Sequence, residues 1–256
     1  MREFDPNALA SLAERYGKAL SRRPILIDEV AAIMPDLCAL LGDAFGRVTL
    51  RGPFRGLDVG TMENFASFLL GAYELELHEW FEALIAANPR RVVNVGCGEG
   101  VYAAGFASRL PEAEIIGFDQ VPAKLDSAAR LLRANGLSGR VDLRHGANPA
   151  QFAAALSPGC VVLMDCEGAE YLLLDPSQVP ALGACAILVE VHDFIVPGVS
   201  DLLLKRFCRS HAIQRRSNVP RDPRRYPELA GMQPALGHLA LNEFRPAMEW
   251  FLLEPL

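Results

Sequence analysis

The sequence lacks the features that would mark a secreted, membrane-spanning or nucleic-acid-binding protein. It has no CxxC pair, no apolar run long enough to span a bilayer, and no apolar signal segment near the N-terminus. Its net charge of −6 argues against nucleic-acid binding driven by bulk charge. We therefore expect a cytoplasmic protein with no membrane insertion and no nucleic-acid partner.

Cysteine is present, but not in a pattern that indicates disulfides or zinc. The six cysteines lie mostly in apolar, strand-like runs. We expect them to be buried free thiols in a reducing compartment. Half of the 256 residues are apolar, which suffices for a substantial core and excludes global disorder.

From Arg91 onward, short apolar runs alternate with helical patterns. Strands are predicted at 91–95, 113–118, 140–145, 160–164, 185–191, 211–217 and 248–253. Helices are predicted at 101–109, 122–134, 150–156 and 199–209. Such alternation is typical of a parallel sheet with helices on both faces, so we expect an α/β fold.

Three segments fall outside this alternation. Residues 1–60 are predicted to form an N-terminal helical extension with helices at 7–20 and 28–41. The apolar faces of these helices are compatible with a homodimer in which they pack on a second copy of the chain. One long helix is predicted from Thr61 to residue 88, so the main domain is expected to cover 61–256. The Pro- and Arg-rich segment 218–247 is too long for an ordinary loop and predicts a lid-like insertion.

A glycine-rich turn, Gly96-Cys97-Gly98-Glu99-Gly100, follows the first predicted strand. Glycines allow backbone to pass close to a ligand, and the N–H groups of the next helix face the same place. Such turns also occur in α/β proteins without any ligand. The G-x-G-x-G spacing departs from the dinucleotide fingerprint and favours a cofactor without a pyrophosphate.

Polar residues follow the other strands, at the sheet edge where α/β proteins bind ligands. Asp119 lies about 20 residues beyond the turn, where an acid would bind a ribose diol. The alternative for Asp119 is a helix N-cap. The remaining strand ends carry Gln120, Gly146, Ala147, Asp165, Cys166, Glu167, Glu190 and His192.

These motifs resemble the class I S-adenosylmethionine-dependent methyltransferases, from about Tyr73 to the end of the chain. VNVGCGEG is similar to their first motif and GFDQ to their second. MDCEGAE, at 164–170, resembles the DxEGxE signature of the FkbM-like group, and VEVHD, at 189–193, fits the same group. The resemblance implies a Rossmann-like, doubly wound sheet of seven mostly parallel strands, with the last strand antiparallel.

The resemblance also implies which residues hold S-adenosylmethionine. Asn94 departs from the pattern, because an acid is more usual where it stands. For Tyr73 and Glu74, core packing or solvent exposure is an equally good interpretation. The implied cofactor-binding residues are Tyr73, Glu74, Asn94, Gly96, Cys97, Gly98, Gly100, Asp119, Gln120, Gly146, Ala147, Asp165 and Cys166.

The implied reaction is O-methylation of a small-molecule acceptor such as a natural product, sugar or lipid. An acceptor hydroxyl must lose a proton, and His192 is the candidate base, with Asp165 at the strand end where the acceptor would approach. Alternatively, Asp165, Glu167, Glu190 and His192 could hold a divalent cation, or the acids could cap helices and pair with arginines.

Two other function classes remain open from the sequence. One is a non-catalytic S-adenosylmethionine-binding regulatory or interaction protein. The other is a dinucleotide-dependent oxidoreductase, which the glycine spacing disfavours. The arginines at 215, 216, 221, 224 and 225 predict either a lid that recognises an acidic acceptor or a solvated loop.

Overall fold

The computed structural model describes residues 4–21, 31–246 and 248–256, so a helix start at residue 28 lies outside the described residues. The chain divides into two compact units, each described here by itself. The smaller unit comprises Met1–Leu75 and Val219–Phe244, and the larger one comprises Glu76–Asn218 and Arg245–Leu256. The division therefore lies at residue 75 rather than 60, and most of the segment 218–247 belongs with the N-terminal residues.

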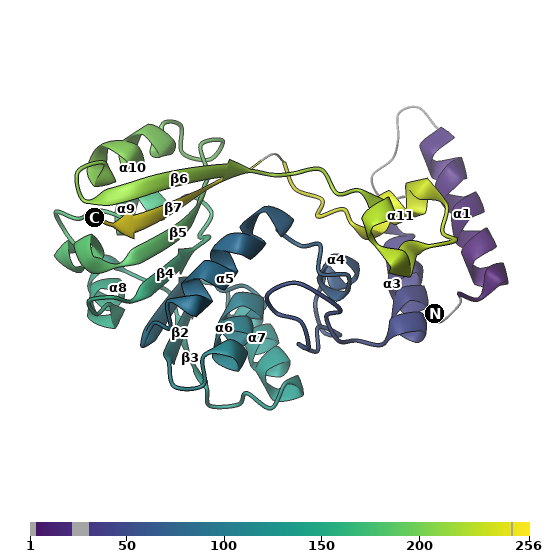
Figure 1. Ribbon diagram of the computed structural model, residues 1–256, viewed down its shortest axis with the longest axis horizontal. Helices are drawn as coiled ribbons and strands as arrows, with labels where there is room; N and C mark the ends of the chain where they lie inside the picture. The colour runs from purple at the N-terminus through teal and green to yellow at the C-terminus, as the bar shows by residue number, and fades with distance from the viewer. Residues whose placement is uncertain (1–3, 22–30, 247) are drawn as a thin grey trace. The chain divides into compact units, whose positions relative to one another are not determined.

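The larger unit is built on a seven-stranded sheet in the order β3-β2-β1-β4-β5-β7-β6 (Figure 1). Its strands are β1 (Arg91–Val95), β2 (Glu114–Asp119), β3 (Val141–His145), β4 (Val161–Met164), β5 (Ala186–Val191), β6 (His211–Ser217) and β7 (Glu249–Pro255). β7 runs antiparallel to β5 and β6, and the other pairs are parallel. The expected sheet, including its antiparallel last strand, is confirmed.

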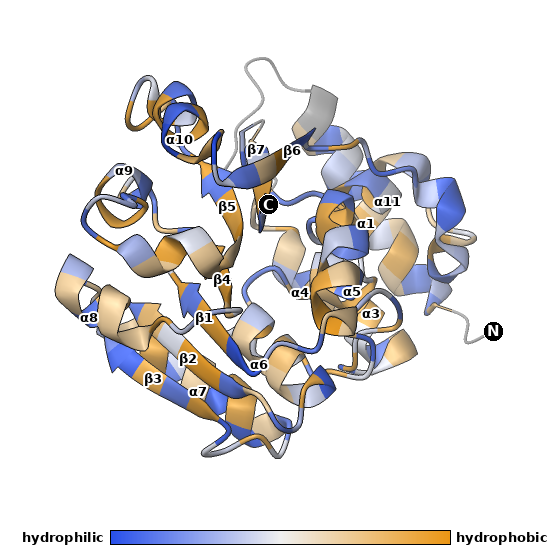
Figure 2. Ribbon diagram, turned by 60° about the vertical axis from the view of Figure 1, so that its left-hand side comes forward, coloured by the Kyte–Doolittle hydropathy of each residue, from blue (hydrophilic) through white to orange (hydrophobic). Residues whose placement is uncertain are grey.

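Helices cover both faces of this sheet because its central strands are apolar on both sides. Val93 and Val95 belong to a buried cluster that includes residues of α8 (Pro149–Ala155), α9 (Glu170–Leu173) and α10 (Val199–Phe207). Successive strand residues face opposite sides. The other face is covered by α5 (His78–Ala86), α6 (Val101–Arg109) and α7 (Pro122–Ala134), and Phe81 of α5 packs against Phe106 of α6. Figure 2 shows the hydrophobic colouring along β4 and β5.

The smaller unit is helical. It contains α1 (Pro6–Ser21), α3 (Met34–Phe45), α4 (Phe65–Leu69) and α11 (Pro234–Ala240), together with the 3-10 turns η3 (Pro223–Arg225) and η4 (Pro227–Leu229). α11 packs against α1 and α3, which are far from it in sequence. The Arg51 guanidinium pairs with Glu228 and lies 5.1 Å from the centre of the Tyr226 ring. These contacts hold 219–244 to the N-terminal residues.

The single long helix predicted over 61–88 is wrong. The chain forms α4, then the 3-10 turn η1 (Leu75–Leu77), then α5. Gly71 and Glu74 between them have positive φ angles of 59° and 45°, which an α-helix cannot contain. A Cβ on Gly71 would lie 2.4 Å from the carbonyl oxygen of Arg51, so close packing fixes the break.

The described cysteines are all free, but only Cys97, Cys160 and Cys185 are buried as expected, whereas Cys38 and Cys166 are partly buried and Cys208 is exposed. Among residues 4–21, 31–246 and 248–256, no helix combines the length and the apolar composition needed to cross a membrane.

Replacing Gly71 with alanine tests the break within the smaller unit. Gly71→Ala is expected to lower the free energy of unfolding by more than the roughly 1–2 kcal/mol cost of a left-handed non-glycine residue, because of the added collision. Gly17→Ala is the matched control: it lies within α1 and its Cβ would meet nothing within 4 Å, so it should stabilise by about 0.5–1 kcal/mol. Urea denaturation measures the free energy of unfolding of both variants, and equal changes would contradict the close packing at Gly71.

Candidate functional site

The turn after β1 is a close meeting point of two loops. Gly96, Gly98 and Gly100 all have positive φ, at 74°, 53° and 86°. A Cβ on Gly96 would lie 1.6 Å from the carbonyl oxygen of Asp165, so no other residue fits there. This approach brings the ends of β1 and β4 together.

Asp119, at the end of β2, holds the same turn through hydrogen bonds. Its Oδ2 accepts from the Gly98 N–H at 2.8 Å, and its Oδ1 accepts from the Val121 N–H at 2.8 Å. An ionised carboxylate offers about four lone-pair sites, so two remain for a ligand. Asp119 therefore fixes the turn and keeps acceptor capacity.

A cavity of about 280 Å³ opens between these strand ends. Seven of the residues predicted to bind the cofactor line this cavity: Gly96, Gly98, Asp119, Gln120, Ala147, Asp165 and Cys166. The other lining residues are Val95, Phe118, Val121, Lys124, Glu167, Ala169 and Leu173. The apolar residues of this lining could not be recognised from the sequence, because every buried strand or helix contains similar residues.

Six expected cofactor residues are not part of this lining. Tyr73 and Glu74 belong to the smaller unit, where Tyr73 stacks on Phe68 with ring centres 4.1 Å apart. The others, Asn94, Cys97, Gly100 and Gly146, lie in the larger unit at or near its strand ends.

Two of these residues have distinct environments. The Cys97 side chain is buried against Gly117, and desolvation together with the charge of Asp119 raises the pKa of its thiol to about 12. Asn94 is 1% exposed, and its Oδ1 has no hydrogen-bond partner within the described residues. An unsatisfied buried acceptor is costly, which makes this oxygen suited to a ligand N–H.

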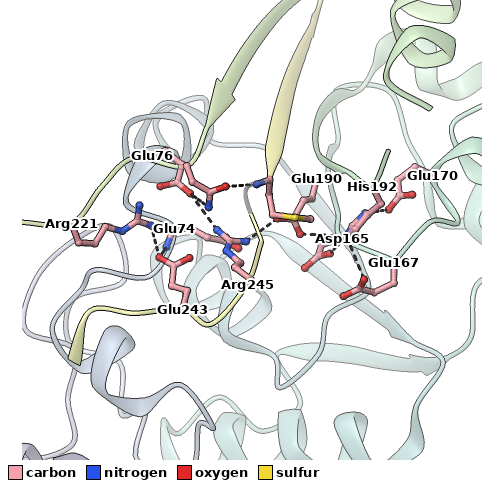
Figure 3. A network of polar contacts seen from close by, with 12 residues as sticks. Glu74, Glu76, Asp165, Glu167, Glu170, Glu190, His192, Arg221, Glu243 and Arg245 are labelled. Carbon is pink, nitrogen blue, oxygen red and sulfur yellow. Dashed lines mark hydrogen bonds and ion pairs between the residues drawn. The ribbon is translucent and has the colours of Figure 1, made fainter. Parts of the chain in front are cut away.

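Next to the cavity, four carboxylates surround one buried imidazole (Figure 3). His192 Nδ1 lies 2.7 Å from Glu170 Oε1. His192 Nε2 lies 3.5 Å from Asp165 Oδ1, 3.6 Å from Glu167 Oε2 and 3.6 Å from Glu190 Oε2. We call these five residues the acidic cluster. They come from the ends of β4 and β5 and from α9.

The acidic cluster controls the protonation of its members. Burial lowers the pKa of His192, but the hydrogen bond to Glu170 and the neighbouring carboxylates outweigh it and raise that pKa overall. Burial opposes ionisation of Glu170, yet its contacts with His192 lower the pKa of this carboxyl. Desolvation raises the pKa of Asp165. Because Glu170 is ionised, Nδ1 of His192 donates to it, and Nε2 faces the other acids.

Backbone strain supports this arrangement. Glu167 has a φ of 54°, a conformation that costs a non-glycine residue roughly 1–2 kcal/mol. Gly168 follows with a φ of 99°. This turn directs the Glu167 carboxylate, whose side chain is 70% exposed, toward His192. Strain of this kind persists where surrounding contacts enforce it, and it is frequent at functional sites.

Arg245 connects to the acidic cluster from a distant part of the chain. Its Nη1 donates to Glu190 Oε1 at 2.8 Å, and its Nη2 donates to Glu76 Oε1 at 3.2 Å. Sequence analysis did not assign a role to Arg245 or Glu76. Their pairing joins positions 169 residues apart, and no local spacing signals such a contact.

Most of the arginines grouped by the sequence are paired with acids. Arg215 pairs with Glu249, and Arg216 with Glu79, both in the larger unit. In the smaller unit Arg221 pairs with Glu243 and Arg224 with Asp222. The five arginines therefore belong to two units rather than to one patch.

Comparison with known proteins identifies the segment that carries the turn. Residues 92–178 match a methyltransferase domain. The match covers about a third of the chain and includes the glycine turn, Asp119 and all of the cavity lining, but ends before Glu190 and His192.

Sequence relatives with this methyltransferase segment match over short stretches. Trans-aconitate 2-methyltransferase of Methylobacterium radiotolerans is 52% identical over 46 residues, 18% of this chain and 18% of that protein. Demethylmenaquinone methyltransferase of Deinococcus radiodurans is 41% identical over 58 residues, 23% and 24% of the two chains. The chain thus spans about a fifth of the length of the curated relatives it matches.

A solved structure shares the fold. A candidate rRNA methylase from Clostridium thermocellum superposes with a TM-score of 0.50 at 15% identity, covering 70% of this chain and 95% of that one. Together with the sheet order, these matches give a methyltransferase-domain segment over residues 92–178 within a shared fold.

The pair Gly96→Ala and Gly98→Ala tests the close approach. Both residues have positive φ, but a Cβ on Gly98 would meet nothing within 4 Å. Gly98→Ala should therefore cost about the 1–2 kcal/mol of left-handed strain, whereas Gly96→Ala should cost clearly more because of the collision with Asp165. Denaturant unfolding of both variants measures the difference. Equal losses would mean that the two loops do not meet as described.

Proposed function

We propose that this chain is an S-adenosylmethionine-dependent methyltransferase that acts on a hydroxyl of a small-molecule acceptor. The observation that carries the proposal is the cavity itself, which joins the glycine turn, Asp119 and the acidic cluster at one edge of the sheet. The methyltransferase-domain match over residues 92–178 supports the same reaction class.

The residues present fit this cofactor. The Asp119 carboxylate retains two acceptor sites for ribose hydroxyls, and Phe118, Val121 and Leu173 give the cavity apolar walls. At about 280 Å³ the cavity is just under the roughly 300–1,000 Å³ usual for small-molecule sites. We also propose that the buried Oδ1 of Asn94, which lies outside the cavity lining, binds the amino group of the methionine part in place of the more usual acid. When bound, the cofactor supplies an electrophilic methyl group.

The acidic cluster is suited to activating an acceptor hydroxyl. Asp165 is shared between the cavity and the cluster, so an acceptor beside the cavity would meet His192 and its carboxylates. The carboxylates stabilise positive charge, so Nε2 of His192 can take the hydroxyl proton and form an imidazolium when no cation is bound to it. Asp165, Glu167 and Glu170 are the acids of the DxEGxE run, and this supports an FkbM-like subgroup.

Apolar groups flank the acidic cluster. The Phe194 ring is 61% exposed and lies 5.8 Å from the His192 ring. Ile195, which is 44% exposed, packs close to Gly168. An acceptor with an apolar portion next to its hydroxyl fits such surroundings. We keep the segment 218–247 as a proposed lid, although the pairing of Arg221 and Arg224 with acids weakens the case for an acidic acceptor.

Titration with S-adenosylhomocysteine and with NAD tests the cofactor assignment. The protein should bind S-adenosylhomocysteine and not NAD. Asp119→Asn should weaken S-adenosylhomocysteine roughly 10- to 100-fold, since hydrogen bonds to charged groups contribute about 1.5–3 kcal/mol. Asp142→Asn, which changes an exposed acid paired with Arg144, is the matched control. This variant should bind S-adenosylhomocysteine as tightly as the wild type does. Binding of NAD instead would favour the oxidoreductase alternative.

A methyl-transfer assay tests the role of the cluster. With an acceptor found by screening hydroxyl compounds, His192→Gln should lower kcat about 100-fold or more while S-adenosylhomocysteine binding stays unchanged. Unchanged turnover would exclude His192 from the reaction. Cofactor binding without transfer to any acceptor in a broad screen would favour the alternative, a non-catalytic S-adenosylmethionine-binding protein.

A further inference from the structure

The acidic cluster places two of its four carboxylates and its imidazole out of contact with water. Glu170 is 0% exposed, Glu190 3% and His192 0%. Buried charges are costly unless they are paired or hold a metal. Arg245 faces Glu190 and is itself shared with Glu76, so its single positive charge does not balance the carboxylates around His192.

Within the described residues, three buried atoms of the cluster lack a hydrogen bond, namely Asp165 Oδ1, Glu170 Oε2 and His192 Nε2. For the His192 side chain taken alone the exposed fraction is 1%, and its Nε2 has no hydrogen-bond partner within the described residues. Its distances of 3.5–3.6 Å to three carboxylate oxygens are too long for a direct hydrogen bond. A group small enough to sit between these atoms would satisfy all of them.

The spacing suits a metal ion. Asp165, Glu190 and His192 each offer one ligand atom, and these atoms lie within 4.8 Å of one another. Ligand atoms bound at about 2.1 Å to one first-row cation lie roughly 3.0–3.4 Å apart at neighbouring positions and about 4.2 Å apart at opposite ones. Small side-chain movements would therefore complete the coordination.

The neighbouring residues orient these three ligands. Glu170 accepts the Nδ1 proton of His192, which leaves Nε2 to act as the ligand. A carboxylate bound to the far nitrogen of a metal-binding histidine is a recurrent arrangement. Arg245 binds Oε1 of Glu190, whereas Oε2 is the oxygen that faces His192. The partly exposed Asp165 and Glu167 side chains lie on the side open to solvent.

We propose that Asp165, Glu190 and His192 bind a divalent first-row cation, with Glu170 positioning His192 and Glu167 at the entrance. Two carboxylate oxygens and one imidazole nitrogen suit Mn²⁺ or a similar transition ion better than Mg²⁺, which prefers oxygen ligands throughout. The binding site stands on its own geometry. Its use, which is to polarise the acceptor hydroxyl, rests on the proposed function.

Mn²⁺ added to the metal-free full-length protein tests the site. Calorimetry should give one Mn²⁺ per chain, with weaker binding of Mg²⁺. Electron spin echo modulation of bound Mn²⁺ should show coupling to an imidazole nitrogen. Asp165→Asn should abolish the tight site. Glu170→Gln should weaken Mn²⁺ roughly 10- to 100-fold, as is usual for residues that orient a ligand. Asp142→Asn, an exposed acid on β3, should bind Mn²⁺ like the wild type.

The outcomes separate this site from the methyltransferase proposal. Absence of Mn²⁺ binding in protein that still binds S-adenosylhomocysteine would overturn the cation site alone. Protons bound to the carboxylates would then neutralise the negative charge of the cluster. Mn²⁺ binding without nitrogen coupling, or unaffected by Asp165→Asn, would also overturn it. Failure to bind S-adenosylhomocysteine, with Mn²⁺ binding intact, would instead overturn the proposed function. Circular dichroism of each variant establishes that it is folded.

Discussion

The close approach of Gly96 to the carbonyl of Asp165 is the constraint on which the site depends. It lets the loops after the paired strands β1 and β4 come into contact, because a side chain at position 96 would occupy the space of the Asp165 backbone. The glycine turn and Asp119 border the cavity on one side, and Asp165 links it to the acidic cluster on the other. The cavity proposed for the cofactor and the acidic cluster are thus neighbours through this contact.

The second constraint is electrostatic. A buried imidazole with the buried Glu170 on Nδ1, and with the buried Glu190 and two more exposed carboxylates around Nε2, is an unusual concentration of charge. The fold stabilises it in part through Arg245, and it tolerates a left-handed Glu167 beside it. Packing alone does not require such residues. Their position at a cavity edge is the reason for the chemical role proposed for them.

Local spacing was sufficient to predict much of the fold and part of the site. Strand–helix alternation predicted the sheet, because buried strands carry apolar runs that can be recognised without a structure. The spacing placed Asp119 at the same edge of the sheet as the glycine turn, but it did not predict the 2.8 Å hydrogen bond from the Gly98 N–H to its carboxylate. Arg245 could not be assigned, since its partner Glu190 is 55 residues away in the chain. The helix over 61–88 was wrong because the Arg51 backbone packs where Gly71 must turn, and periodicity carries no information about such contacts.

A crystal structure of the full-length chain with S-adenosylhomocysteine tests the central claim most directly, which is that one cavity joins the cofactor to the acidic cluster. The account predicts the ribose hydroxyls on Asp119, with the sulfur atom directed toward Asp165 and His192. Binding at another place, or a sulfur atom directed away from the acidic cluster, would contradict it.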